Sequence, residues 1–232
     1  VRWAVDVPVP ASFVFEQEAA ELRRAALSFL EMERASLAEG DDGKWRYFEL
    51  SFGGGEQKTQ YQLTDGSWLN VRGRVDRVDE LGDGSLRVID YKMGKVAVYR
   101  KDPKLGRFNG GRQLQPAMYA GVLDGLLESR VARFEYRFPT ERGRNASVAY
   151  TAAELAEARP LVTQLLEHAR DGTFIPTTSR DDCSYCDAGA ICRVSRSRFG
   201  QVTSPRAAWA EANAEGIAAY AGMLSRRTRE AR

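Results

Sequence analysis

The spacing of apolar positions predicts helices near both ends of the chain. In residues 16–38 apolar side chains recur three or four positions apart with charged residues between them, which predicts an amphipathic helix. Thr151-Ala-Ala-Glu154 has the pattern of a capping box and predicts a second helix that runs to Arg170. Further helices are expected at about 113–128 and near 205–225.

Alternation of apolar and polar positions predicts strands in the middle of the chain. Residues 45–52 (WRYFELSF) alternate aromatic and polar side chains, which is typical of a half-buried strand. Three shorter runs, separated by turn residues, follow at 60–64, 68–78 and 86–92. The segment from 45 to 92 is therefore predicted to be an antiparallel meander, and residues 131–138 add another strand.

The order of these elements predicts an α/β fold with a mixed central sheet flanked by helices. We expect one domain over residues 1–200 and a helical extension over 201–232. The chain begins at Val1 rather than Met, which favours a piece of a longer polypeptide over a processed or trimmed chain.

Composition excludes several classes of protein. The chain is 43% hydrophobic and 28% charged, as expected for a globular protein rather than a disordered or collagen-like one. Lys+Arg 34 nearly balance Asp+Glu 32, so any surface that binds nucleic acid must come from local clustering. No stretch reaches the ~18 consecutive apolar residues of a membrane helix, and the first residues do not have the pattern of a signal peptide.

The most informative segment joins two predicted strands through a hairpin. Asp76 lies within the first strand and Asp90 near the end of the second, so the hairpin brings both carboxylates to the same end of the sheet. Lys92 is two residues beyond Asp90 and therefore points to the same face. Paired carboxylates suit Mg²⁺ or Mn²⁺, which prefer oxygen ligands. A lysine beside them can stabilise charge that develops on a phosphate.

Asp-x-Lys alone is a weak signal, because the two side chains would equally form a surface ion pair on an edge strand. The surrounding motifs favour the catalytic interpretation. They are Gly73–Asp79 (GRVDRVD), Asp90–Lys92 (DYK) and, in variant form, Gln113–Tyr119 (QLQPAMY). Together, over about residues 45–193, they resemble the nuclease domain of the RecB/AddB family within the PD-(D/E)xK superfamily. The segment Phe48–Gly53 is similar to that family's glutamate-bearing strand.

The resemblance implies a restriction-endonuclease-like fold and metal-dependent hydrolysis of DNA. It implies that Asp76, Asp90 and the backbone carbonyl of Tyr91 bind the metal, and that Lys92 is the catalytic lysine.

The resemblance also suggests roles for residues around this centre. Gln113 and Tyr119 are expected on a helix that faces the site and contacts the substrate. Two roles are open for Glu49, which either supports the metal through water or simply lies on the sheet face. Asp79 is expected to contact an arginine rather than the metal.

Three cysteines, Cys183, Cys186 and Cys192, lie within ten residues of one another. An odd number at this density is a poor disulfide framework and, without a secretion signal, favours a reducing, cytoplasmic setting. The C-x2-C-x5-C spacing suits Zn²⁺ or an iron–sulfur cluster. The resemblance implies a 4Fe-4S cluster with a distant N-terminal fourth cysteine, whereas Zn²⁺ is the alternative. Residues 1–182 contain no cysteine, so the fourth ligand is either upstream of the chain or lost.

Basic residues gather around the predicted site. Two arginines alternate along the strand that carries Asp76, and a basic loop follows Lys92. Positive side chains around a nuclease cleft are expected to bind DNA phosphates, with solvated loops as the alternative interpretation. The candidates for contact with DNA are Arg72, Arg74, Lys95, Arg100, Lys101 and Arg112.

The sequence therefore predicts a Mg²⁺- or Mn²⁺-dependent deoxyribonuclease of exonuclease-like type, which processes single-stranded DNA ends in repair. The chain has no Gly-rich ATPase loop, so a helicase would be a separate domain or subunit. The alternative is a catalytically weak or inactive DNA-binding module with the same fold. The lack of a histidine in residues 16–38, where the family often has one, and of a fourth cysteine favours this alternative. Intact Asp76, Asp90 and Lys92 argue against it.

Overall fold

The computed structural model describes residues 11–54, 59–100, 108–172 and 187 of the 232-residue chain. The chain divides into two compact units, each of which is described by itself. The first comprises Val1–Arg100 and Gln113–Ala158, and the second comprises Lys101–Arg112 and Arg159–Arg232. The three cysteines and the predicted C-terminal extension lie outside the described residues.

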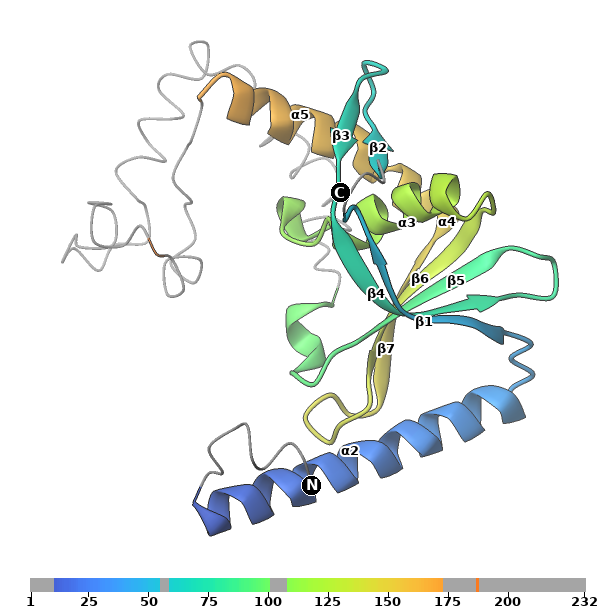
Figure 1. The fold of residues 1–232 in the computed structure, drawn as a ribbon, viewed down its shortest axis with the longest axis vertical. Coiled ribbons are helices and arrows are strands. Elements are labelled where there is room, and N and C mark those ends of the chain that lie inside the picture. The colour runs from blue at the N-terminus through green and yellow to red at the C-terminus, as the bar shows by residue number, and fades with distance from the viewer. Residues whose placement is uncertain (1–10, 55–58, 101–107, 173–186, 188–232) are drawn as a thin grey trace, which may run out of the picture. The chain divides into compact units, whose positions relative to one another are not determined.

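A five-stranded mixed sheet forms the centre of the first unit, in the order β1-β4-β5-β6-β7 (Figure 1). β5 and β6 run parallel, and the other neighbouring pairs are antiparallel. This sheet confirms the predicted α/β fold with a mixed sheet. The strands are β1 Lys44–Phe52, β4 Gly73–Glu80, β5 Leu86–Tyr91, β6 Val131–Phe138 and β7 Ala146–Thr151.

The predicted meander is wrong in its strand pairing. β1 pairs with β4, whereas the two short strands between them, β2 (Gln60–Gln62) and β3 (Trp68–Asn70), form a separate ribbon. Alternation along each strand does not distinguish these pairings, because it reports the two faces of a strand and not its neighbour. The strand β7 is absent from the predicted elements. It ends at Thr151, where the capping box begins.

The described helices are α2 (Ser12–Ala38), α3 (Gln115–Leu126), α4 (Ala152–Ala156) and α5 (Ala158–Arg170). The predicted helix from 151 to 170 is therefore two helices. The capping box is confirmed, since the Glu154 carboxylate accepts the Thr151 N–H at 2.8 Å and the Glu154 N–H donates to the Thr151 hydroxyl at 3.3 Å. None of the described helices is long and apolar enough to cross a membrane.

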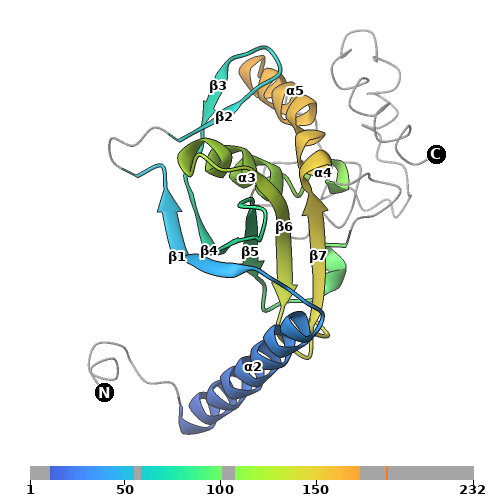
Figure 2. The same cartoon turned by 90° about the vertical axis from the view of Figure 1, so that its right-hand side faces the viewer.

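The two faces of the sheet differ in chemistry. α2 and α3 cover opposite faces (Figures 1 and 2). On the α3 face the core is aromatic, with Phe134, Tyr136 and Phe138 of β6 at most 1% exposed. On the α2 face the sheet buries arginines and carboxylates instead. Buried charges of this kind are costly unless they are paired.

Asp79 is the centre of this buried ion network. Its carboxylate accepts hydrogen bonds from Arg77 at 2.6 and 2.8 Å and from Arg87 at 2.7 Å. Glu33 of α2 accepts from Arg77 and from Arg137, each at 2.8 Å. The network thus joins α2 to β4, β5 and β6, and it confirms that Asp79 contacts arginine.

Candidate active site

The strands β4 and β5 bring Asp76 and Asp90 together, as the sequence predicts. Arg77 pairs with Ile89 in the antiparallel ladder, which places Asp76 opposite Asp90 one position further on. The Asp76 carboxylate accepts a hydrogen bond from the backbone N–H of Tyr91 at 2.7 Å. Asp76 therefore closes this end of the ladder and holds the last residues of β5.

Asp90 is a buried carboxylate with a lysine partner. Its residue surface is 4% exposed, and the Lys92 Nζ lies 2.5 Å from Asp90 Oδ2. Besides this ion pair, Asp90 Oδ2 has no hydrogen-bond partner in the described part of the chain. Burial raises the pKa of Asp90 above the usual range of a carboxyl, Lys92 opposes the increase, and the charge of Asp76 adds to it. A cation near both carboxylates would relieve this cost.

Two tyrosines fix the position of the Lys92 side chain. Its Nζ lies 5.4 Å from the ring centre of Tyr136 and 5.9 Å from that of Tyr99, within the range of cation–π attraction. The lysine is thus held between a carboxylate and two aromatic faces. No pattern in the sequence indicates this role, because Tyr136 fits the alternation of a core strand and Tyr99 lies in a loop.

The helix α3 places Gln115, rather than Gln113, beside Asp90. Gln115 Nε2 donates to Asp90 Oδ1 at 3.3 Å, and its Oε1 accepts from the Tyr136 hydroxyl at 3.1 Å. Gln113 lies before the helix, where it donates to the Val98 carbonyl and accepts from the Tyr150 hydroxyl. Pro116 in the first turn is the sequence signal that could have placed the helix start at Gln115.

Tyr119 lies one helical turn after Gln115, against the start of β4. Its ring packs edge-on against Phe52 at 5.0 Å. A Cβ atom added at Gly73 would lie 2.5 Å from Tyr119 Cζ and Oη. The glycine of the GRVDRVD motif therefore makes room for Tyr119, three residues before Asp76.

We expect Gly73→Ala to lower the free energy of unfolding by about 1–3 kcal/mol, the range for overpacking. The added methyl would meet the Tyr119 ring, and either the ring or β4 would have to move. Gly125→Ala is a matched control, because nothing lies within 4 Å of a Cβ added there and α3 gains a better helix former. Urea denaturation of both variants measures the difference. Equal stability of the two variants would contradict this packing.

Glu49 lies on the surface of the edge strand. The pairs Phe48–Arg77 and Leu50–Val75 put Glu49 level with Asp76, but its φ of 53° interrupts the regular strand. Its carboxylate forms an exposed ion pair with Arg74 Nε at 3.1 Å. This position corresponds to the second of the two roles left open by the sequence, a residue of the sheet face.

The predicted DNA-binding residues are distributed over both units. Arg72, Lys95 and Arg100 are exposed in the first unit. Arg112 is exposed in the second unit and donates to the Asn109 carbonyl at 3.1 Å. Lys101 lies outside the described residues, as do the cysteines. The only histidine of the chain, His168, is buried on α5.

The donor set fits a hydrated hard cation. Within residues 11–54, 59–100, 108–172 and 187, no group of three or more Asp, Glu, His or Cys side chains could hold a metal ion. What the site offers is two carboxylates, Asp76 and Asp90, with a buried oxygen of Asp90 that accepts no hydrogen bond besides its ion pair. Mg²⁺ usually binds through one or two carboxylates and keeps several waters. The residues therefore fit Mg²⁺ or Mn²⁺ better than a zinc centre of three or four protein ligands.

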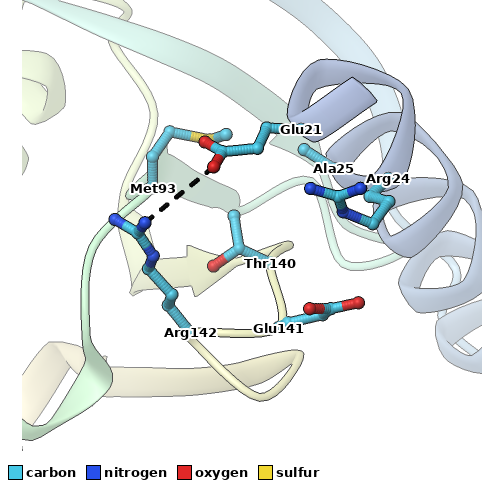
Figure 3. A pocket seen from close by; sticks show the side chains of 7 residues that line it. All are labelled: Glu21, Arg24, Ala25, Met93, Thr140, Glu141 and Arg142. Carbon is cyan, nitrogen blue, oxygen red and sulfur yellow. Dashed lines mark ion pairs between the residues drawn. The ribbon is translucent and has the colours of Figure 1, made fainter. Parts of the chain in front are cut away.

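A pocket of about 190 Å³ lies elsewhere in the first unit (Figure 3). Met93, the residue after Lys92, belongs to its wall, but Asp76, Asp90 and Lys92 do not. Its charges largely balance, and Arg142 approaches Glu21 at 4.0 Å. The pocket therefore does not mark the carboxylate site. It is lined by Glu21, Arg24, Ala25, Met93, Thr140, Glu141 and Arg142.

Comparison with known proteins gives relatives of one kind, each named as a subunit of an ATP-dependent helicase/deoxyribonuclease. The chain is 36% identical over 104 residues to the protein of this name from Clostridium tetani, which is 43% of this chain and 8% of that protein. It is 41% identical over 93 residues to the protein from Clostridium botulinum, covering 38% of this chain and 7% of that one. The match to the Heliobacterium modesticaldum protein is 36% over 101 residues, or 39% and 8%. The chain thus matches less than a tenth of the length of these relatives.

The family is shown by a longer match. Residues 2–193, which include both motif strands and α3, match the PD-(D/E)XK nuclease superfamily. The mixed sheet and the placement of Asp76, Asp90 and Lys92 agree with this match. The chain therefore belongs to the PD-(D/E)XK nuclease superfamily.

Proposed function

We propose that the chain hydrolyses phosphodiester bonds of DNA in a reaction that requires Mg²⁺ or Mn²⁺. The observation that carries this proposal is the buried Asp90 carboxylate, paired with Lys92 and level with Asp76 at the end of the sheet. Membership of a nuclease superfamily and relatives whose names include a deoxyribonuclease support the same activity.

Each residue of the site has a distinct part in this proposal. Asp76, Asp90 and the Tyr91 carbonyl would hold the cation, which polarises the phosphate and lowers the pKa of bound water. Lys92 would offer its ammonium to the phosphate and stabilise the charge that develops there. Gln115 would keep Asp90 in position through its bond to Oδ1.

The broader setting is proposed from the relatives. Their name joins a deoxyribonuclease to an ATP-dependent helicase. We place this chain accordingly as the nuclease part of a DNA-end-processing assembly, with exonuclease-like action on single strands that a helicase domain or a separate helicase supplies. Gln113, Tyr119 and the exposed basic residues would contact the DNA there.

The test is cleavage of end-labelled DNA, single-stranded and duplex, in Mg²⁺, Mn²⁺ or EDTA. We expect products with either metal and none in EDTA, with single-stranded DNA cleaved faster. Products of equal amount in EDTA would contradict a metal-dependent nuclease. Binding of DNA without products in any metal would instead support the inactive DNA-binding module.

We propose in addition that Cys183, Cys186 and Cys192 bind a 4Fe-4S cluster, with a fourth ligand that is not a cysteine of this chain. Their C-x2-C-x5-C spacing supports this assignment. Metal analysis of protein purified without oxygen should find iron and sulfide. A colourless protein that contains zinc would favour the alternative, a zinc site.

A further inference from the structure

The ribbon of β2 and β3 has one face fixed against α3. The ring of Tyr61 lies against Gly121 of α3, where an added Cβ would come within 2.7 Å of it. Leu63 is 2% exposed, and Thr59 donates its hydroxyl to the Val71 carbonyl at 2.7 Å. This inner face holds the ribbon in a defined position, so the side chains of its outer face are presented by a rigid support.

The outer face of the ribbon carries an aromatic ring among amides. Trp68 is 54% exposed, and its partner across the ribbon is Gln62. Gln60 donates its side-chain amide to the Asn70 side chain at 3.0 Å, which orders both groups. An exposed tryptophan with amides beside it suits a ligand that has flat rings and polar edges. A protein partner would be expected to meet a more apolar patch.

The exposed face continues from the ribbon into β4 (Figures 1 and 2). Arg72 and Arg74 are exposed, whereas the residues between and beside them, Val71, Gly73 and Val75, are turned inward or half-buried. Arg74 is two residues before Asp76 in the chain. A tryptophan, two amides and two arginines thus lie along one stretch of extended backbone that leads to the proposed catalytic strand.

We propose that this face, Gln60, Gln62, Trp68, Asn70, Arg72 and Arg74, binds a single strand of nucleic acid next to the carboxylate site. A base stacks on Trp68, the amides meet base edges, and the arginines contact phosphates. Glu49 also lies at this face, paired with Arg74. Because an exposed ion pair contributes little, a phosphate can replace Glu49 as the partner of Arg74. The inference rests on the proposed function, since it assumes that DNA is the substrate.

The test measures binding without cleavage. A fluorescent single-stranded oligonucleotide is titrated with the Asp90→Asn protein and, in parallel, with the wild-type protein in EDTA. Trp68→Ala should weaken binding about tenfold, in the range for the loss of one base–aromatic stack. Trp68→Phe should retain most of the affinity, because a flat ring remains. Arg72→Gln should weaken binding and reduce its dependence on salt by about one counterion.

Trp45→Ala is the matched control. Trp45 is 61% exposed, but it lies on β1 opposite Asp79, on the face that α2 covers. Its removal should leave the affinity unchanged. Equal affinity of Trp68→Ala and the parent protein, or equal losses for the two tryptophans, would overturn the proposal. Failure of the wild-type protein to cleave DNA would count against the nuclease function alone, because these titrations need no cleavage.

Discussion

Replacement of Lys92 by Met is expected to lower the rate of DNA cleavage at saturating DNA by about 10²–10³-fold, the range for the loss of one electrostatic donor to a transition state. Lys92 is the cation that the structure places at the carboxylate pair, 2.5 Å from Asp90. Methionine keeps the length and apolar stem of the side chain and can still pack against Tyr99 and Tyr136. The substitution therefore removes charge with little loss of packing.

The same substitution should change the pH dependence of metal binding. Burial already raises the pKa of Asp90, and Lys92 opposes that increase. Without Lys92 the pKa rises further, so Asp90 is ionised and able to bind metal only at higher pH. Mn²⁺ titrations over a pH series should show the acid limb displaced to higher pH in the Lys92→Met protein.

Lys44→Met is the control for both measurements. Lys44 is exposed at the start of β1, at the far end of that strand from the site, and its partner in the ladder is Glu80. Loss of this lysine should alter neither the cleavage rate nor the pH profile. A Lys92→Met protein that cleaves DNA as fast as wild type would remove Lys92 from the proposed mechanism.

Asp79→Ala is expected to lower the free energy of unfolding by about 3–5 kcal/mol, the range for the loss of one partner from a buried ion pair. The Asp79 side chain is fully buried and accepts hydrogen bonds from Arg77 and Arg87, whose side chains are 3% and 8% exposed. Alanine would leave both guanidinium groups buried without this partner. The midpoint of urea denaturation should therefore fall clearly.

The neighbouring Glu80→Ala controls for loss of a carboxylate from β4. Glu80 is 47% exposed in its side chain and approaches Arg46 at 3.3 Å. Such a surface pair contributes about 0–1 kcal/mol, so the change in stability should be small. If Asp79→Ala proved as stable as Glu80→Ala, the buried network would not contribute to stability as described.

The carboxylate–lysine cluster could be predicted from the sequence because it depends on local geometry. A hairpin joins the strands of Asp76 and Asp90, and the two-residue period of a strand puts Lys92 on the face of Asp90. The separate ribbon could not be predicted in the same way. The pairing of β1 with β4 depends on contacts between residues distant in the sequence, such as Phe52 with Gly73.

The surroundings of the site also depend on tertiary packing. Gln115 meets Asp90 because α3 begins at that residue, and helix boundaries are poorly fixed by local pattern. Glu33 bridges Arg77 and Arg137, each far away in sequence, and in the sequence it is one of several charges on an amphipathic helix. The ligands could therefore be named from the sequence, whereas the residues that hold them in position could not.

The central claim is that Asp76 and Asp90 support metal-dependent cleavage of DNA. Its most direct test is the rate of cleavage of end-labelled single-stranded DNA in Mn²⁺ by the wild-type protein and by the Asp76→Asn/Asp90→Asn variant, at DNA concentrations that saturate both. We predict products that accumulate with the wild-type protein and stay at background with the variant. Equal rates for the two proteins would contradict the assignment of the active site.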